Sequence, residues 1–257
     1  MSDSPRELPP YTALAAGYDL VMDHVDYEEW ARYAHALLRE WRPEAESLVE
    51  LGCGTGSLAL ELQPLGDYEY LASDRSESMI RVARWKAQDR GVPLQFRVED
   101  FTELELDRRF DAAILLYDGL NYLLEVEKVE RLLQAAAGVL RPGGVFLFDQ
   151  STPSNSESDP SYFEDEGAAE GFRYRRTSRY DPETLRHTTR FELEVEGRTY
   201  VEEHVQRAYP HDRIRAVIEA SPLELEVAYD GLTREAAGRG SARIHWVTRK
   251  PDEDTAA

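Results

Sequence analysis

Three glycines at alternate positions form the most informative pattern in the sequence. Gly52, Gly54 and Gly56 follow the apolar run Leu48-Val49-Glu50-Leu51 and precede a helix-like stretch that begins at Ser57. Glycine lets the backbone turn tightly and approach a ligand closely, and the first turn of a helix offers unpaired N–H groups. The pattern therefore predicts a strand–turn–helix unit that binds a ligand at the turn.

Two carboxylates narrow the chemistry of that ligand. Glu50, just before the turn, would repel a pyrophosphate but can accept a hydrogen bond from an ammonium group. Asp74 ends the next predicted strand, 22 residues after Gly52, a spacing that suits a carboxylate binding ribose hydroxyls. Ser57 stands where the dinucleotide fingerprint G-x-G-x-x-G has its third glycine. A nucleoside that carries an amino acid is favoured; helix capping and solvated strand ends are the alternative roles for the two carboxylates.

Strands and helices alternate regularly around this turn. The predicted strands are 47–51, 68–73, 94–98, 110–117 and 145–148, and the predicted helices are 57–65, 76–90 and 126–140. Such alternation implies right-handed crossovers and a mainly parallel sheet with helices on both faces. We expect a doubly wound, Rossmann-like α/β domain with the first strand at its centre and the ligand at the carboxyl ends of the strands.

The pattern differs at the two ends of this unit. Apolar and aromatic residues at helical spacing predict two helices within 11–41, whereas 151–161 reads as a loop by composition. Three strands, 172–180, 185–196 and 200–209, then have charged outward positions, as in an antiparallel meander with one wet face. We expect 1–150 and 210–250 to form the main domain, 161–209 a small antiparallel β lid inserted after the fifth strand, and 251–257 a disordered tail.

Composition sets broad limits on function. The 257 residues carry 50 acidic and 30 basic side chains, a formal net charge of −20, which weighs against binding to nucleic acid. No apolar run reaches the roughly 18 residues of a membrane helix, and no signal-peptide pattern is present, so we expect a cytoplasmic protein without membrane contact. The single cysteine, Cys53, excludes an intramolecular disulfide, and the six histidines lack zinc-site spacing, so no metal is expected. The sequence gives no indication of oligomeric state.

The chain resembles the class I S-adenosylmethionine-dependent methyltransferases over most of its length. The resemblance rests on the glycine turn, Asp74, Glu99-Asp100-Phe101, Ala113-Ile114-Leu115-Leu116-Tyr117-Asp118 and Leu140-Arg141-Pro142-Gly143-Gly144. The chain is also similar to a narrower bacterial group of small methyltransferases in 16–23, 117–123 and 203–209, except that Gly119 stands where a serine is expected. The family fold implies a seven-stranded sheet whose final strand, 242–248, runs antiparallel in a hairpin with 223–229.

The resemblance also implies S-adenosylmethionine as cofactor and a role for each matching residue. The three glycines would line its methionine and ribose portions, Glu50 would bind its amino-acid end and Asp74 its ribose. Asp100 would accept from the adenine amino group. The complete expected set comprises Tyr18, Glu50, Gly52, Gly54, Gly56, Asp74, Arg75, Met79, Asp100, Phe101 and Tyr117.

The acceptor side is expected next to the sulfonium, at Tyr117 and Asp118. His204 and Arg207 both belong to a matching stretch, but in a strand their side chains have opposite parity, so only one of them would face a cavity. We predict His204 as the substrate-side residue and, because a lid encloses small ligands, a small-molecule acceptor. The alternatives are a methyltransferase acting on RNA or protein, a non-catalytic cofactor sensor, and a nicotinamide-dependent oxidoreductase, against which Glu50 and Ser57 argue.

Overall fold

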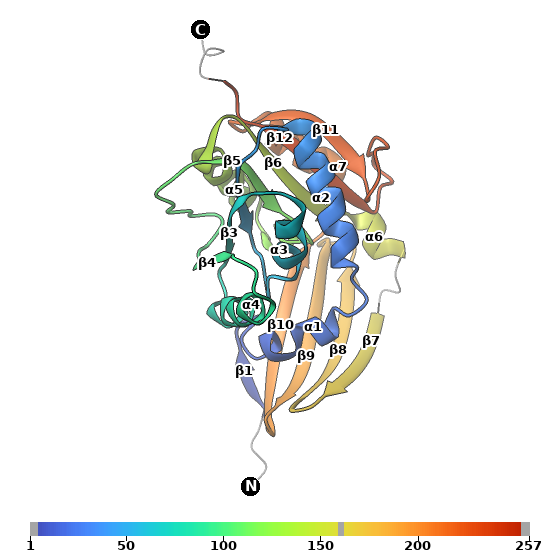
Figure 1. The fold of residues 1–257 in the computed structure, drawn as a ribbon. Coiled ribbons are helices and arrows are strands. Elements are labelled where there is room, and N and C mark those ends of the chain that lie inside the picture. Colours follow the sequence, from blue (N-terminus) through green and yellow to red (C-terminus); the bar gives the residue numbers. More distant parts are fainter. Residues whose placement is uncertain (1–4, 159–161, 253–257) are drawn as a thin grey trace.

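The computed structural model describes residues 5–158 and 162–252, which form two β-sheets and the helices around them (Figure 1). The strands are β1 (Arg6–Leu8), β2 (Ser47–Leu51), β3 (Glu69–Asp74), β4 (Gln95–Val98), β5 (Phe110–Leu115), β6 (Leu140–Ser151), β7 (Tyr162–Ala169), β8 (Phe172–Asp181), β9 (Arg186–Val195), β10 (Arg198–Arg207), β11 (Glu224–Asp230) and β12 (Arg243–Arg249). The helices are η1 (Leu14–Gly17), α1 (Tyr18–Val21), α2 (Tyr27–Trp41), α3 (Ser57–Leu62), η2 (Gln63–Leu65), α4 (Glu77–Arg90), η3 (Leu120–Tyr122), α5 (Val126–Val139), α6 (Pro153–Ser158) and α7 (His211–Glu219).

Seven strands form the main sheet, in the order β11-β12-β6-β5-β2-β3-β4. Strands β2 to β6 are parallel, whereas β12 pairs antiparallel with both β6 and β11. The Rossmann-like sheet and its closing hairpin are thereby confirmed. The first predicted strand, β2, is not the middle strand, because the hairpin lengthens the sheet on one side; β2 instead lies where the strand order reverses. Ligands of open α/β sheets bind at such a point.

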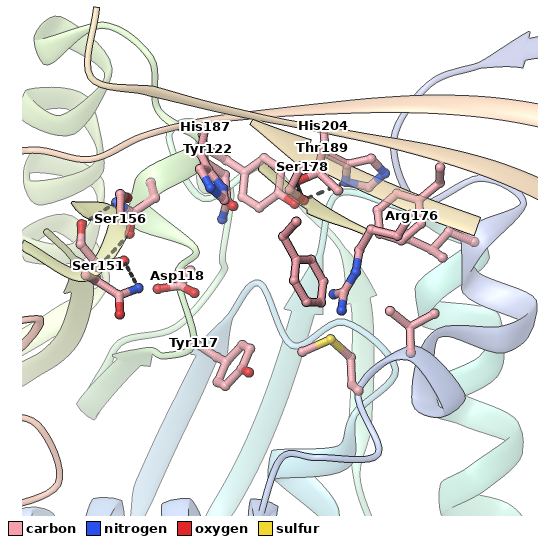
Figure 2. A pocket seen from close by; sticks show the side chains of 18 of the residues that line it. Tyr117, Asp118, Tyr122, Ser151, Ser156, Arg176, Ser178, His187, Thr189 and His204 are labelled. Atoms are coloured by element: carbon pink, nitrogen blue, oxygen red, sulfur yellow. Dashed lines mark hydrogen bonds between the residues drawn. The ribbon is translucent and has the colours of Figure 1, made fainter. Parts of the chain in front are cut away.

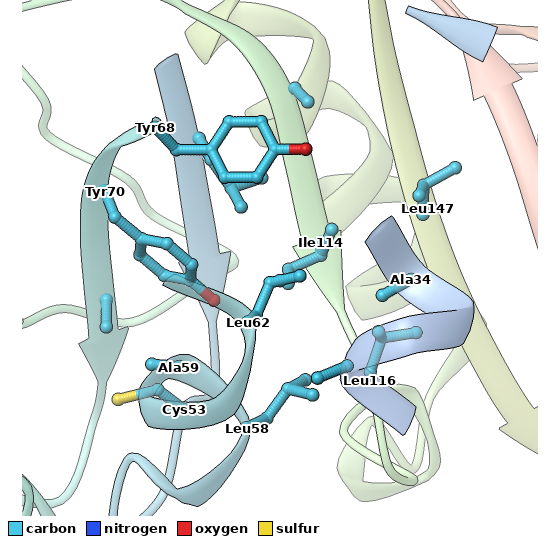
Figure 3. Close-up of a cluster of buried hydrophobic side chains, with 14 of the residues drawn as sticks. Ala34, Cys53, Leu58, Ala59, Leu62, Tyr68, Tyr70, Ile114, Leu116 and Leu147 are labelled. Carbon is cyan, nitrogen blue, oxygen red and sulfur yellow. The ribbon is translucent and has the colours of Figure 1, made fainter. Parts of the chain in front are cut away.

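Alternate side chains of these strands pack against helices on opposite faces of the sheet. On one face, Leu48, Ile114 and Leu147 join a cluster with α2, α3 and α4 (Figure 3). On the other, Val49 and Phe146 pack against α5 and α7. Because both faces are covered, β2 and β5 are completely buried, which accounts for their nearly continuous apolar sequence.

The second sheet contains five strands, in the order β1-β10-β9-β8-β7. Figure 1 shows it extending away from the main sheet, with α1 lying across it. Its inner face packs against the N-terminal segment through a small apolar cluster of Leu14, Val21, Phe172, Tyr174, Phe191 and Leu193. Tyr174 is buried while Arg173 and Arg175 are exposed, so the alternation of these residues follows the two faces of a strand.

The second sheet is larger than the three predicted strands. β1, from the N-terminus, pairs parallel with β10, although the sequence placed its residues in the main domain. β7 was missed because its acidic stretch has low strand propensity; it is stabilised by pairing with β8, where Arg175 and Arg176 bind Glu164 and Asp165.

The loop predicted at 151–161 is wrong in part. β6 continues to Ser151, and Pro153 occupies the first position of α6, where proline is well tolerated because no N–H is needed there. Residues 159–161 of that loop and 253–257 of the expected tail lie outside the described residues. None of the helices within 5–158 and 162–252 has the length and apolar character required to span a membrane.

Candidate active site

The glycine turn, Gly52 to Gly56, connects β2 to α3 in a left-handed backbone conformation. All three glycines have positive φ, 67°, 55° and 76°, which L-residues with a side chain rarely adopt. A Cβ added at Gly54 would meet nothing closer than the Tyr18 ring at 3.9 Å, so open space lies in front of this residue. The turn therefore combines a backbone conformation that favours glycine with room for a ligand, as the sequence predicts.

Glu50 is a buried carboxylate that faces this space. It lines a small pocket of about 40 Å³, the glycine-turn pocket, together with Gly52 and Gly54. Tyr70 Oη donates a hydrogen bond of 2.8 Å to Glu50, and no ion pair reaches this carboxylate from the described residues. Burial raises the pKa of Glu50 to about 7, although the Tyr70 hydrogen bond opposes the rise. A cation that entered the pocket would therefore gain a buried, uncompensated carboxylate as its partner.

Asp74 lies across the same turn at the end of β3. Its carboxylate accepts hydrogen bonds from the backbone N–H of Gly54 at 2.9 Å and of Ser76 at 2.7 Å. Burial raises the pKa of Asp74, while these two hydrogen bonds oppose the rise. Asp74 thus couples the glycine turn to the beginning of α4, which fixes the edge where a ribose is expected.

The residues expected around adenine follow β3 and β4. Met79 is buried, whereas Arg75 is exposed and lies 3.8 Å from Asp100. The Asp100 side chain accepts from Thr102 N and Oγ1, at 2.9 and 2.7 Å. A Cβ built at Gly52 would lie 3.7 Å from the Phe101 ring, so this segment adjoins the glycine turn.

Tyr117 and Asp118 follow β5 and both have positive φ, 69° and 66°, which is strained for residues other than glycine. An ion-pair group of two half-buried residues, Asp118 and Arg243, and the fully buried Asp149 holds them. Arg243 donates to both Asp118 oxygens, at 2.7 and 3.1 Å, and also binds Asp149. The Arg243 guanidinium lies 5.4 Å from the centre of the Tyr117 ring. The hairpin strand β12 therefore determines how this loop is presented.

A cavity of about 370 Å³ lies between this loop and the second sheet (Figure 2). We call it the inter-sheet cavity. Tyr18 and Tyr117 line both this cavity and the glycine-turn pocket, so the two spaces meet at these rings. Its polar lining comes from the loops after β5 and β6 and from β8, β9 and β10, and consists mainly of Asp118, Asn121, Tyr122, Ser151, Arg176, Ser178, His187, Thr189, His204 and Gln206.

His204 and Gln206 face the cavity, as their shared parity on β10 requires. Arg207 points elsewhere: it donates to the carbonyl of Leu124 and lies over the ring of Tyr209. The choice of His204 over Arg207 as the cavity-facing residue is thus consistent with the structure. The described part of the chain contains no cluster of three or more histidine, cysteine and carboxylate groups able to hold a metal ion.

Several cavity residues carry no sequence signal of their own. Arg176 belongs to a strand of alternating arginines, and Tyr11 and Tyr122 read as core aromatics. Arg243 and Glu202, which bind the cavity residues Asp118 and His204 but do not line the cavity, look like ordinary strand charges. Only the long-range packing of these strands identifies them. Cys53, by contrast, fits the sequence interpretation as a small residue, because it is buried and burial raises the pKa of its thiol well above the usual value.

Comparison with known proteins agrees with this geometry. Residues 48–144 match a family model described as a methyltransferase domain. A protein of Geobacillus sp. (strain WCH70), named as a candidate methyltransferase, is 28% identical over 247 residues, which cover 93% of this chain and 99% of that protein.

Solved structures share the fold. An S-adenosylmethionine-dependent methyltransferase from Clostridium acetobutylicum ATCC 824 gives a TM-score of 0.78 at 22% identity, over 94% of this chain and 99% of that one. CalS10 from Micromonospora echinaspora, described as an amino pentose methyltransferase with S-adenosylmethionine bound, gives a TM-score of 0.69 at 21% identity. The match covers 91% of this chain and 96% of that one. The glycine turn and its two carboxylates lie within the matched methyltransferase domain, and the chain has the fold of solved S-adenosylmethionine-dependent methyltransferases.

Proposed function

We propose that this enzyme methylates a small molecule held in the inter-sheet cavity. The observation that carries the proposal is the volume and position of that cavity. About 370 Å³ lies within the size range of small-ligand sites, and the cavity shares Tyr18 and Tyr117 with the glycine-turn pocket. An acceptor in the cavity would therefore lie beside the sulfonium end of a cofactor bound at the turn.

The second sheet supports a small acceptor over a macromolecular one. Four of its strands, together with the N-terminal segment, wall the cavity, and this arrangement leaves little room for a folded RNA or protein. The net charge of −20 opposes binding to a phosphate backbone. CalS10, which shares the fold, is an amino pentose methyltransferase, and this agrees with a small acceptor.

The residues present fit S-adenosylmethionine. The open space before Gly54 admits a ligand chain against the backbone, and Glu50 offers its buried carboxylate to the ammonium group. Asp74 would bind the ribose, and Asp100 with Phe101 the adenine, flanked by Met79. When bound, the cofactor supplies a methyl group already activated by a positively charged sulfur.

The protein must then orient the acceptor and exclude water. Tyr117 stands where the two spaces meet, and burial raises the pKa of its hydroxyl to about 12, so it remains neutral and able to donate a hydrogen bond. Asp118 is held by Arg243 on both oxygens, so we assign it the role of positioning the Tyr117 loop. His204 faces the acceptor from the second sheet.

Transfer of a labelled methyl group tests the proposal. The purified enzyme is incubated with methyl-labelled S-adenosylmethionine and with cell extract separated into small molecules, RNA and protein. We expect label in the small-molecule fraction. Label confined to RNA or protein would contradict the proposal, and Gly54→Val, which should not bind the cofactor, is the control for non-enzymatic methylation.

A further inference from the structure

A chain of hydrogen bonds links the inter-sheet cavity to a fully buried carboxylate. Tyr11 Oη donates to Tyr122 Oη, and Tyr122 Oη lies 3.1 Å from His204 Nδ1. His204 Nε2 lies 3.2 Å from Glu202 Oε2. The first three residues line the cavity, whereas Glu202 has no exposed surface.

The hydrogen bonds around Glu202 determine the direction of this chain. Its oxygens accept from the backbone N–H groups of Tyr11 at 2.7 Å, Ala13 at 2.5 Å and Leu14 at 3.0 Å. An ionised carboxylate can only accept hydrogen bonds, and these three donors suit that form. A neutral His204 that donates from Nε2 to this carboxylate has a lone pair on Nδ1, which accepts from the Tyr122 hydroxyl.

We propose that Tyr11, Tyr122, His204 and Glu202 form a proton relay that removes the proton of the acceptor during methyl transfer. This proposal rests on the proposed function, because it requires an acceptor in the inter-sheet cavity. It assigns the acceptor to the compounds whose attacking oxygen or nitrogen still carries a proton that must leave.

The step balances as follows in atoms and charge. The attacking atom forms a bond to the methyl carbon, and the methyl–sulfur bond breaks with its electron pair left on sulfur. The acceptor proton passes to Tyr11 Oη, the Tyr11 proton to Tyr122 Oη, and the Tyr122 proton to His204 Nδ1. His204 becomes an imidazolium whose charge is stabilised by Glu202, and it returns the proton to solvent after product release.

The backbone of Tyr11 supports a functional role. Its φ is 64°, which is strained for a tyrosine, and two hydrogen bonds hold it there: its N–H donates to Glu202 and its carbonyl accepts from Ser76 Oγ at 3.0 Å. Burial raises the pKa of both tyrosine hydroxyls, so they pass a proton on and do not store a negative charge. Glu202 is a positioning residue, since it acts through His204.

The groups that face His204 are few. Glu202 lies on the same strand, Tyr11 on the N-terminal segment and Tyr122 on η3. From β9, His204 pairs with Thr189 and its ring contacts Phe191, and His187 is the next titratable side chain along that face.

Nitrogen NMR of the imidazole tests the geometry without any acceptor. In the wild-type protein at pH 8 we expect His204 as the tautomer with hydrogen on Nε2, and in Glu202→Gln we expect the hydrogen on Nδ1, because the amide can donate to Nε2. A wild-type His204 with its hydrogen on Nδ1 would overturn the relay.

Enzyme kinetics test whether the relay takes part in methyl transfer. The wild type and Tyr122→Phe are compared in transfer of labelled methyl to purified alcohols, phenols and amines; methylated alcohols or phenols identify oxygen as the attacking atom, and methylated amines nitrogen. We expect Tyr122→Phe to lower kcat by about 10²–10⁴-fold, the usual contribution of general base catalysis, with affinity for S-adenosylhomocysteine unchanged.

Tyr68→Phe is the matched control, because Tyr68 Oη also bonds a histidine, His35 Nδ1, at 3.0 Å, but lies outside the cavity. Its kcat should equal that of the wild type. An active wild type with an unaltered Tyr122→Phe would refute the relay alone. A wild type that methylates none of these compounds but methylates RNA or protein would refute the proposed function.

Discussion

Cofactor binding should depend steeply on pH below neutrality, because Glu50 must ionise to bind an ammonium group. Burial holds the pKa of Glu50 at about 7, and no basic side chain in the described part of the chain forms an ion pair with it. Below that pKa the carboxyl is protonated, and each pH unit lowers the ionised fraction about tenfold. The dissociation constant of S-adenosylhomocysteine should therefore be roughly fiftyfold higher at pH 5 than at pH 7, about 2.3 kcal/mol, with a slope that approaches tenfold per pH unit toward pH 5.

Calorimetry between pH 5 and 7 measures this dependence, since the amino-acid part of the ligand keeps both charges in that range. Repeating the titration in buffers of different ionisation enthalpy should reveal release of nearly one proton on binding at pH 6. Glu50→Gln should bind more weakly at pH 7 and lose the steep dependence, retaining only the part due to Asp74. Tyr70→Phe should move the midpoint to higher pH, because the Tyr70 hydroxyl favours the ionised carboxylate. Wild-type affinity that is constant from pH 5 to 7, or a Glu50→Gln variant as pH-dependent as the wild type, would refute the reasoning.

Three further changes probe the rest of the site. Gly54→Val should abolish binding of S-adenosylhomocysteine by calorimetry while circular dichroism shows a folded protein, and Gly91→Val, with φ 64° and open space remote from the turn, should bind normally. Asp74→Ala should weaken binding by about 1–3 kcal/mol; unchanged affinity would mean that another group holds the ribose. Arg243→Gln should lower the free energy of unfolding in urea by about 3–5 kcal/mol at pH 8, since it leaves the fully buried Asp149 and the half-buried Asp118 without a cation. This loss of unfolding free energy should become smaller toward pH 5. Burial raises the pKa of Asp149 to about 6, so at pH 5 the carboxyl is protonated and no longer needs a cation.

The part of the fold that the sequence predicts well is the part specified by local pattern. The turn is predicted by its three glycines, Gly52, Gly54 and Gly56, because few other residues adopt positive φ. Completely buried strands such as β5 are predicted by their apolar runs. The residue that ends β3, Asp74, follows from spacing alone. These features depend on short segments, so tertiary packing did not alter them.

The sequence predicts only part of the second sheet, because the formation of its other strands depends on pairing with neighbouring strands. β1 has three residues, too few for a sequence pattern, and forms only because β10 offers a free edge. The acidic side chains of β7 form ion pairs with arginines of β8, and this pairing stabilises β7 as a strand. Such elements are specified by contacts between distant segments, which composition and periodicity do not report.

The same limit applies to the acceptor side of the active site, where residues act in pairs far apart in the sequence. Tyr122 and His204 are 82 positions apart, and Asp118 and Arg243 are 125 apart. The sequence predicts Asp118 on the acceptor side, next to the sulfonium; in the structure both its oxygens accept hydrogen bonds from Arg243. His204 looked like one polar residue of a lid strand, yet it is the side chain through which buried Glu202 reaches the cavity. The cofactor side is built on one local turn that the family shares. The acceptor side is instead assembled from the N-terminal segment, η3, β10 and β12, so its chemistry can be inferred only from the folded structure.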